Sequence, residues 1–450
     1  GNGSSSDEET VCQCLVKLLG GDHADCRQFF LSSQGTALVP AGMAHHSVLV
    51  RKTSIGLLTS KTFDEEWVRW LWSQGFLLAL LKAVVDPSNQ VSSAASSALF
   101  KASATPWGQE AIFTDHGAQL VRLCEDNSNS TVQLRVLELV CRVWQLSPEC
   151  AELCKRTPAR ALLVKMIDSD DILLQLNAVE IISLLPPLEI GKDVMPKLAQ
   201  AVEMCGEPIV AARLVECICR FVAELPDEDT DSVSPDLESA LHRLLMARFA
   251  AGGPSGGQEI ADTLHSLAVL CSTSRGFQSF ANSGHAPTTI AGLASLIQSL
   301  HQPTRLAALE ASVRVLQQAT SERESILCER AFSSLAPFLL TLARGPMPEQ
   351  KIGALCLFRA MAIHAWGLRN MFAESDFLAF ITDRRAETFK LALDEKFSVV
   401  RTAANHPEIL EVVGQERCDV LRAFVGQGAY YTPNERGAHP NNVQVASEHL

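Results

Sequence analysis

Cysteine and histidine are the residue types with the most chemistry to offer in this chain, which has 14 of the first and 12 of the second. Both bind zinc when pairs stand two to five residues apart, and a thiolate beside an imidazole can act as a nucleophile. The cysteines form no C-x-x-C pair, and the adjacent His45 and His46 belong to no H-E-x-x-H pattern. Cys141, Cys217 and Cys356 stand among apolar residues, where free cysteine packs as a small hydrophobe. We expect reduced packing cysteines, a solvated histidine pair, and no metal, cofactor or catalytic site.

Two segments imitate phosphate-binding loops without completing one. The segment from Gly56 to Thr62 lacks the glycine before Lys61 that lets backbone N–H groups wrap a phosphate. Gly426-Gln427-Gly428 lacks the third glycine and follows no predicted strand. No G-x-S-x-G nucleophile turn occurs. An enzyme that uses one of the scattered cysteines stays open as a minor alternative, because a nucleophile and its base can be far apart in sequence.

A glutamate followed four residues later by an arginine recurs in three predicted helices. The pairs are Glu138/Arg142, Glu216/Arg220 and Glu310/Arg314. Residues four apart share one helix face, and glutamate before arginine is the favoured order, stabilising a helix by about 0.2–0.5 kcal/mol. One interpretation is helix support alone. The other is that the pairs, extended by Arg135 and Arg213, form a ladder of alternating charge that docks a partner of mixed charge.

The only two tyrosines are adjacent, Tyr430 and Tyr431, just after the last apolar helical segment. They have two interpretations. The rings can cap the open end of the last apolar stripe, or they can contact a partner, because tyrosine offers a large amphipathic area at low entropy cost.

Composition excludes several classes of function. The net charge is −13, and no run of lysine and arginine suits a phosphate backbone, so we expect no nucleic-acid binding. The most apolar stretch, residues 75–81, is much shorter than the roughly 18–20 residues that span a bilayer. The first ten residues have no apolar core of a signal peptide. We expect a monomer by itself, in the cytoplasm and also in the nucleus, without contact to a membrane.

The elements that position these residues are predicted to be helices throughout. Apolar residues recur at i, i+3, i+4 and i+7, as in Val132, Val136, Leu139 and Val143. A recurring break precedes a short helix at Gly108, Gly276 and Gly367, which are 168 and 91 residues apart, or four units of 42 and two of about 45. Weaker versions of this break occur between and beyond these three positions and raise the number of predicted repeat starts to ten.

An all-helical repeat of this length is typical of HEAT and armadillo arrays, which bind other proteins along their stacked final helices. The predicted fold is therefore an all-α, HEAT/armadillo-like α-solenoid of about ten helical repeats. We predict a disordered acidic segment 1–10, the solenoid over 11–425, and a tail over 426–450. An acidic loop at 226–231 and a glycine-rich loop at 252–257 interrupt the array.

The C-terminal part resembles one family, the 26S proteasome non-ATPase regulatory subunit 5. The residues that carry the resemblance are Trp366, Met371-Phe372, Phe377, Phe380, Asp383-Arg384, Phe397, Ala404-Asn405, Leu421-Arg422, Gly428 and Tyr430-Tyr431. It continues more thinly upstream, through Gly108, Glu110 to Phe113, Arg135-Val136, Glu138-Leu139, Ser147 to Glu149 and Asp262. Ala429 departs from the proline that the family usually carries there.

The resemblance implies a non-catalytic assembly chaperone for the base of the proteasome regulatory particle. Such a protein binds ATPase subunits of the base, through their C-terminal small domain, and the large non-ATPase scaffold subunit, before the base joins the core particle. The alternative is a generic armadillo cargo or scaffold adaptor, similar to nuclear import receptors. Those receptors use repeated tryptophan and asparagine four residues apart, a spacing that only Trp366 and Asn370 show here.

Overall fold

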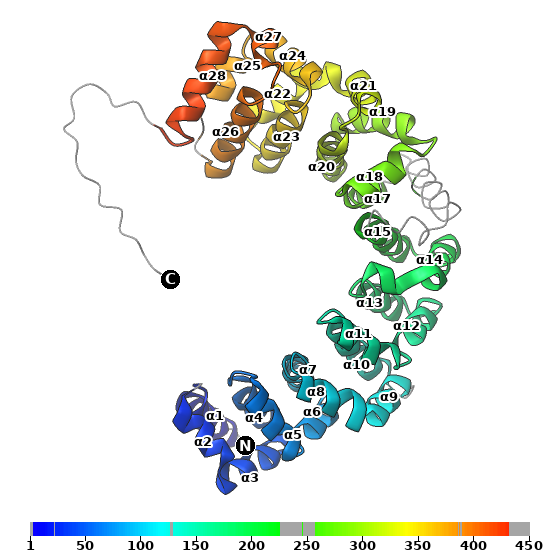
Figure 1. The fold of residues 1–450 in the computed structure, drawn as a ribbon, viewed down its shortest axis with the longest axis vertical. Helices are drawn as coiled ribbons and strands as arrows, with labels where there is room; N and C mark the ends of the chain where they lie inside the picture. Colours follow the sequence, from blue (N-terminus) through cyan, green and yellow to red (C-terminus); the bar gives the residue numbers. More distant parts are fainter. Residues whose placement is uncertain are drawn as a thin grey trace, which may run out of the picture. The chain divides into compact units, whose positions relative to one another are not determined.

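The computed structural model describes residues 3–21, 23–126, 129–225, 245, 257–385, 387 and 389–431. Within these ranges every regular element is a helix, so the all-α prediction is confirmed (Figure 1). The chain divides into two compact units, which we call unit 1 (Gly1–Ile218 with Asp229–Leu237) and unit 2 (Cys219–Glu228 with Glu238–Leu450). The predicted acidic loop, nearly all of the glycine-rich loop and residues 432–450 of the tail lie outside the described residues.

Unit 1 is built from short helices joined by tight turns. They are α1 (Gly3–Leu19), α2 (Ala24–Leu31), α3 (Ser33–Met43), α4 (Val48–Thr59), α5 (Glu65–Ser73), α6 (Phe76–Ala83), α7 (Asn89–Ser103), α8 (Pro106–Gln109), the π-helix η1 (Glu110–Asp115), α9 (Gly117–Glu125), α10 (Ser130–Trp144), α11 (Pro148–Lys155), α12 (Ala159–Ile167), α13 (Ile172–Ile182), α14 (Pro187–Met204) and the first part of α15 (Pro208–Glu224).

Unit 2 continues in the same style. After the end of α15 it contains α17 (Gly257–Leu270), α18 (Ser274–Ala281), α19 (Ala286–Ile297), α20 (Gln302–Gln318), α21 (Glu322–Phe332), the 3₁₀ turn η2 (Ser333–Leu335), α22 (Ala336–Arg344), α23 (Pro348–Met361), α24 (Ala365–Ala373), α25 (Phe377–Thr382), α26 (Lys390–Ala404), α27 (Ile409–Val413) and α28 (Gln415–Gln427).

Most repeats contain three helices, and the longest, which we call the third helix, stacks on the third helix of the next repeat. In unit 1, α4 packs on α7, α7 on α10 and α10 on α13, and these helices begin 41 or 42 residues apart. In unit 2, α17 packs on α20, α20 on α23 and α23 on α26, with starts 42 to 46 residues apart. This is the packing of an α-solenoid within each unit. The count of about ten repeats stays a prediction.

The glycine marks of the sequence lie where the chain crosses the end of the preceding third helix. A Cβ on Gly108 would lie 2.0 Å from the Ala102 carbonyl oxygen, and one on Gly367 would lie 2.0 Å from that of Met361. Gly276 is equally confined, 1.9 Å from the Leu270 oxygen. A real Cβ cannot come so close to a backbone atom. The repeat therefore needs glycine because two backbone segments touch there.

A polar residue at the fourth position of most third helices ties that helix to the second helix of its own repeat or to the next repeat, and sequence periodicity did not reveal it. Gln133 donates to the Cys124 carbonyl and Gln175 to that of Ile167, so each binds the end of the second helix before it. Arg305 donates to the Ser299 carbonyl and also to the Gln350 side chain of the next repeat. Arg51 and Lys351 reach the next repeat through Asp86 and Glu387. The bonds of Gln133, Gln175 and Arg305 to backbone carbonyls satisfy acceptors at or just beyond helix ends that would otherwise be orphaned.

One described helical segment, Glu322–Arg344, has the length and mean hydropathy that would let it cross a membrane. Charged residues such as Glu329 and Arg330 interrupt its apolar residues, so no unbroken apolar run marks it in the sequence. Phe332, Leu335 and Leu339 are each at most 1% exposed. Buried apolar side chains are what a core helix of a folded unit shows, and we interpret the segment in that way.

The two ends of the described chain differ from the predicted boundaries. Helix α1 begins at Gly3, so residues 3–10 belong to the first helix, although we expected them to be disordered. Helix α28 ends at Gln427, two residues after the predicted end of the solenoid. Acidic and small residues are poor markers of disorder when an apolar helical stripe follows at once. The remaining division into solenoid and tail stays a prediction.

His364 makes the stability of unit 2 depend on pH. Burial lowers the pKa of His364, although the hydrogen bond between its Nε2 and the Leu316 carbonyl, 2.9 Å long, opposes that shift. The unfolded chain therefore binds a proton near the ordinary pKa of about 6.5, before the folded chain does. We expect stability to be complete above that pH and to fall as the pH drops through the window between 6.5 and the lowered pKa.

Denaturant unfolding of the chain and of a His364→Gln variant between pH 7.5 and 5 measures this contribution. The variant should be less stable at pH 7.5 and should lose less stability on acidification than the original chain. If the free energy of unfolding changes equally with pH in the two proteins, His364 has the same pKa in the folded and the unfolded chain.

Candidate protein-binding surface

The predicted glutamate–arginine pairs occupy one register of the third helices. Glutamate is the ninth residue and arginine the thirteenth in α10, α15 and α20. In α10 the Arg142 guanidinium lies 3.6 Å from Glu138, and both side chains are about half exposed, as expected of an i,i+4 pair. Arg142 also lies 5.5 Å from the ring centroid of Phe100 in α7. Glu138 and Arg142 therefore face solvent, and Arg142 lies where α10 packs on α7.

The other two pairs do not follow the simple i,i+4 scheme. In α15, Glu216 forms its ion pair with Arg213, at 2.7 Å. In α20, Glu310 lies 3.6 Å from the Nδ1 atom of His265 in α17. The hydrogen bond to His265 holds the pKa of Glu310 below its ordinary value, and the charges of His265 and Arg314 act in the same direction. The ladder is thus partly lateral, from one helix to the next.

A second lateral pair was missed by sequence reasoning. Arg359 of α23 lies 3.2 Å from Glu395 of α26, and both are partly buried. The two residues are 36 positions apart, so no local spacing signals the contact. Together with Glu310 and Arg314 these residues give unit 2 alternating charges across three stacked third helices, and we call this surface the charged face.

One cavity opens on the charged face of unit 2. It has a volume of about 210 Å³ and is lined by Arg220, Glu224, Glu310 and Arg314 together with Ala268 and Ser272. The two arginines can bind a carboxylate of a partner, and the two glutamates can bind a partner's lysine or arginine. The cavity therefore suits a partner surface that carries both charges. Arg220 and Arg314 are thereby brought together, although 94 residues separate them.

Arg135, expected on the ladder, has a different role. Its guanidinium donates to the Asp86 carbonyl at 3.0 Å and to the Asn89 side chain, both at the start of α7. Arg135 thus joins α10 to the start of the preceding third helix, and its contact with a partner stays a prediction.

The tyrosine pair is anchored to unit 2 and still exposed. The Tyr430 hydroxyl donates a hydrogen bond to Asp394, which raises the pKa of Tyr430. Arg384 lies 5.7 Å from the ring centroid of Tyr431 and donates to the Phe424 and Gly428 carbonyls at the end of α28. Tyr430 is 55% exposed and Tyr431 42%. Both interpretations of the pair, capping and partner contact, are compatible with this placement.

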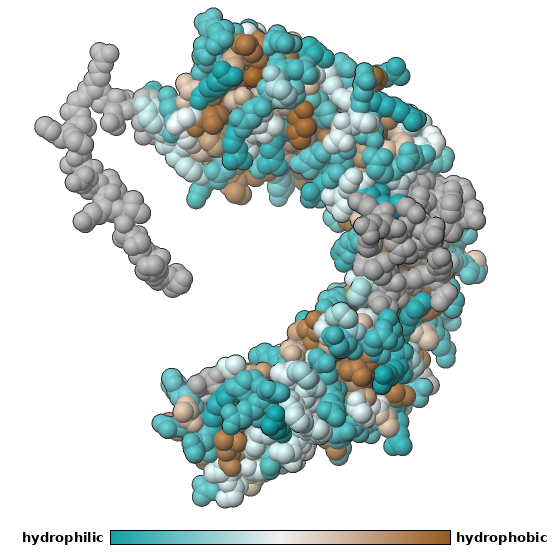
Figure 2. All heavy atoms as spheres, in the orientation of Figure 1, coloured by the Kyte–Doolittle hydropathy of each residue, from teal (hydrophilic) through white to brown (hydrophobic). Residues whose placement is uncertain are grey.

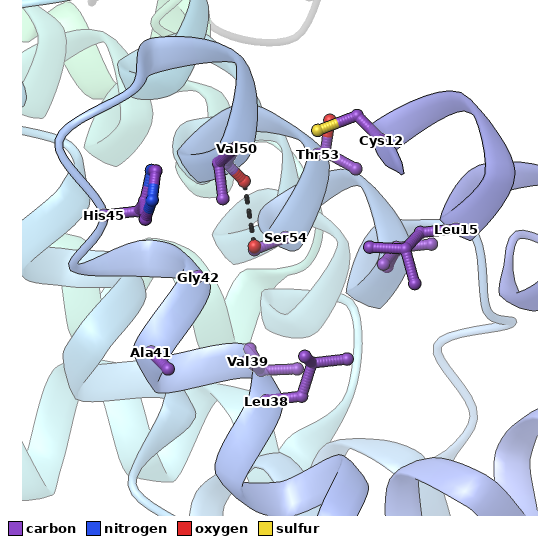
Figure 3. A pocket seen from close by; sticks show the side chains of 11 residues that line it. Cys12, Leu15, Leu38, Val39, Ala41, Gly42, His45, Val50, Thr53 and Ser54 are labelled. Atoms are coloured by element: carbon purple, nitrogen blue, oxygen red, sulfur yellow. Dashed lines mark hydrogen bonds between the residues drawn. The ribbon is translucent and has the colours of Figure 1, made fainter. Parts of the chain in front are cut away.

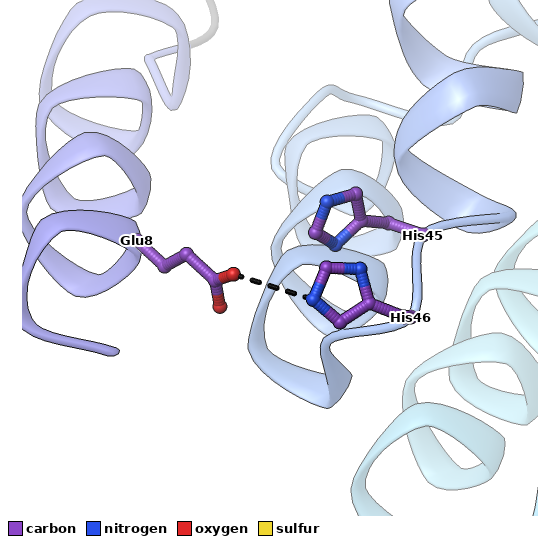
Figure 4. Close-up of side chains that lie close together, drawn as sticks. All are labelled: Glu8, His45 and His46. Carbon is purple, nitrogen blue, oxygen red and sulfur yellow. Dashed lines mark ion pairs between the residues drawn. The ribbon is translucent and has the colours of Figure 1, made fainter. Parts of the chain in front are cut away.

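Glu8, His45 and His46 bring their potential ligand atoms within 4.8 Å of one another (Figure 4). The imidazole rings of His45 and His46 are tilted against each other, with centroids 4.2 Å apart and planes 35° apart. The Nδ1 atom of His45 also accepts a hydrogen bond from the Ser47 N–H. Glu8 and His46 form an ion pair at 3.6 Å. The ion pair joins α1 to the loop before α4.

A small apolar cavity lies beside that ion pair, between α1, α3 and α4 (Figure 3). Its volume is about 200 Å³, and Leu15, Val39 and Leu57 are among its lining residues. Few polar groups face it. It is best understood as imperfect packing of α1 on the array.

No disulfide joins the cysteines in the described residues, and ten of the fourteen are buried. Burial raises the pKa of Cys124 and of Cys328 to about 12 and that of Cys356 to about 11. Such thiols stay protonated at neutral pH and are poor nucleophiles. The packing interpretation fits this geometry.

A thiol-labelling experiment checks that interpretation. With a neutral disulfide reagent at pH 7.4 we expect labelling of Cys14, Cys26 and Cys205, which are exposed or partly exposed. The buried thiols should react only after denaturation. Fast labelling of one buried cysteine in the folded chain would instead support the alternative of a cysteine-dependent enzyme.

Comparison with known proteins places the chain in a family. A family model described as the proteasome non-ATPase 26S subunit matches residues 4–443. The chain belongs to this family. Its relatives include the 26S proteasome non-ATPase regulatory subunit 5 of Bos taurus, 24% identical over 410 residues, which cover 87% of this chain and 80% of the relative. The subunits of that name from Homo sapiens and Mus musculus are 23% and 22% identical and cover 78% and 87% of this chain.

Among solved structures, an engineered protein covers 90% of this chain and 97% of its own length at 14% identity and a TM-score of 0.46, too low to support an inference. Membership in a family of non-ATPase subunits gives the chain a proteasome-related role and indicates no enzymatic activity. The resemblance found in the sequence is confirmed.

Proposed function

We propose that the chain is a non-catalytic chaperone for assembly of the base of the proteasome regulatory particle. In this proposal it binds base ATPase subunits by their C-terminal small domain, and the large non-ATPase scaffold subunit, before the base joins the core particle. It acts as a monomer in the cytoplasm and also in the nucleus. The observation that carries the proposal is the family match over residues 4–443.

The geometry supports a binding role through the charged face. In unit 2, stacked third helices hold Glu310 and Arg314 alongside Arg359 and Glu395, so positive and negative side chains alternate on this surface. A rigid array loses little conformational entropy when a partner binds. Gripping the small domain of an ATPase subunit would orient that subunit and obstruct its premature docking on the core particle.

The armadillo cargo adaptor is disfavoured by the placement of Trp366. Its indole is 3% exposed and donates a hydrogen bond to Ser325, and its ring stacks on His364. A tryptophan that reads a peptide must present its ring to solvent. The one Trp/Asn pair with the spacing of an import receptor is therefore a packing feature.

Affinity capture with the tagged full chain from cell extract at physiological salt tests the proposal, with mass spectrometry of the bound proteins. We expect base ATPases and the large non-ATPase scaffold subunit, without core-particle subunits. Import cargo in their place would favour the adaptor. Recovery of complete proteasomes would indicate a resident subunit and contradict the chaperone role.

A further inference from the structure

Three large apolar side chains stand in solvent where two consecutive repeats of unit 1 meet. They are Leu173 at the start of α13, Met204 at the end of α14 and Ile209 at the start of α15, with exposed fractions of 70%, 79% and 57%. Single exposed apolar residues are ordinary, but a group of them marks an interaction site. Figure 2 shows that hydrophobic residues also gather in small groups among hydrophilic ones on the drawn face of unit 1.

A groove of about 580 Å³ joins the two repeats at this place. Asp168 and Asp170, in the turn before α13, line it from one repeat, and Met204 and Val210 line it from the other. Val210 and Leu214, which also lines the groove, are at most 1% exposed. The groove therefore combines buried apolar side chains with exposed carboxylates, and Met204 lies at its opening.

The exposure of Leu173 is not that of a frayed helix end. The Asp171 carboxylate caps α13 and accepts hydrogen bonds from the N–H groups of Leu173 and Leu174, at 2.9 and 3.2 Å. Gln175 donates to the Ile167 carbonyl at 2.9 Å and so holds the first turn of α13 on α12. Leu173 is thus held in solvent by a fixed backbone. A partner that covers a fixed side chain loses less entropy than one that must first order it.

Charge indicates what covers these apolar side chains. Six exposed carboxylates lie in the same turns and helices, namely Asp168, Asp170, Asp171, Glu180, Glu203 and Glu207. Within the part of the chain that the structure describes, none of the six forms an ion pair. The cations nearest in sequence are Lys165, Lys197 and Arg213, of which Lys197 lines the groove and Arg213 is already paired with Glu216 at 2.7 Å. The excess of charge is negative, so this surface complements lysine and arginine.

We propose that Leu173, Met204, Ile209 and the groove beside them bind a segment of a partner protein in which lysine or arginine alternates with large apolar residues. A lysine or arginine side chain suits the groove, because its apolar stem packs on buried apolar side chains while its charge reaches Asp168 and Asp170. The apolar residues of the segment pack on the three exposed side chains. This surface belongs to unit 1, whereas the charged face belongs to unit 2, and the proposal does not depend on the identity of the partner under the proposed function.

Fluorescence anisotropy with three labelled peptides tests this proposal on the full chain. The basic apolar probe is three repeats of Leu-Lys-Phe-Lys, the acidic probe is three repeats of Leu-Glu-Phe-Asp, and the basic polar probe is three repeats of Ser-Lys-Ser-Lys. We expect the basic apolar probe to bind at least about tenfold more tightly than either of the others, because it alone matches both the carboxylates and the apolar side chains.

Two variants separate the apolar contribution from the charged one. The apolar variant carries Leu173→Gln, Met204→Gln and Ile209→Gln, and the charge variant carries Asp168→Lys and Asp170→Lys. Each should weaken binding of the basic apolar probe by about tenfold or more. The matched controls change exposed residues elsewhere in unit 1, namely Val11→Gln, Val16→Gln and Leu18→Gln in α1, and Glu110→Lys and Asp115→Lys in η1. Both controls should bind this probe nearly as the original chain does.

Three results would overturn the proposal. Equal binding of the two basic probes would show that the apolar side chains take no part. Equal losses in the charge variant and its control would show that the net charge of −13 attracts the probe without a site. If the original chain sediments as a dimer and the apolar variant as a monomer, the occupant is a second copy, and the partner assignment fails.

Discussion

Replacing Gly367 by alanine should strongly destabilise unit 2. The new Cβ would lie 2.0 Å from the Met361 carbonyl oxygen and 2.7 Å from its carbon, so α24 must move away from the end of α23. Overpacking against backbone costs about 2–4 kcal/mol. For a cooperative unit of this size that loss lowers the melting temperature by roughly 5–10 °C. Thermal melting followed by circular dichroism measures it, and Gly276→Ala should behave alike.

The matched control is Gly292→Ala in the interior of α19, where a Cβ would have no neighbour within 4 Å. Alanine is the better helix former there, by about 0.5–1 kcal/mol. We expect this variant to melt slightly higher than the original chain. If Gly367→Ala melts at the same temperature as the control variant, the close contact between the end of α23 and α24 does not require glycine.

Reversing three arginines of the ladder, Arg142, Arg220 and Arg314, to glutamate should weaken binding of the partner by about 10- to 100-fold. Arginine contacts in interfaces are frequent hot spots, and every tenfold loss equals about 1.4 kcal/mol. The melting temperature should change by only a few degrees, because exposed pairs contribute little to stability. Titration of a fluorescent base ATPase domain with each variant gives the affinity.

The control variant reverses three exposed arginines on other helices, Arg122 in α9 and Arg323 and Arg330 in α21. Both variants shift the net charge from −13 to −19, so long-range repulsion is matched. Equal affinity of the two variants would show that the ladder only supports its helices. Early melting of the ladder variant alone would show that its arginines are structural.

Local patterns predicted the helices because each repeat is built from local contacts. The 3.6-residue apolar periodicity predicted α10 from Val132 to Val143. The glycine marks predicted three breaks before short helices, and the structure shows that backbone segments touch at these points. The register of Glu138 and Arg142 was also readable, since residues four apart share a face.

Contacts between repeats could not be predicted in the same way. Glu310 pairs with His265, 45 residues away, and Arg359 with Glu395, 36 residues away. Which partner a charge takes depends on the rotation of one helix against the next, and apolar periodicity fixes that rotation only to within a face. For the same reason Arg135 was placed on the binding surface although it ties α10 to the start of α7.

The starts of α23 and α26 show a different limit. Met347 and Phe389 look like ordinary members of an apolar stripe in the sequence, and only the structure shows that they precede the first turn of a helix with their side chains exposed. An unusual residue at a helix start could have been noticed only if the start itself were known. Helix boundaries are the least certain part of a sequence prediction.

Binding of the purified chain to individual base ATPase subunits, in the presence and absence of core particle, tests the central claim most directly. The chaperone account predicts a stable complex with the C-terminal small domain of at least one ATPase subunit, and exclusion of the core particle from that complex. Binding to no base ATPase, or a chain that remains bound when the same ATPase docks on the core particle, would contradict it.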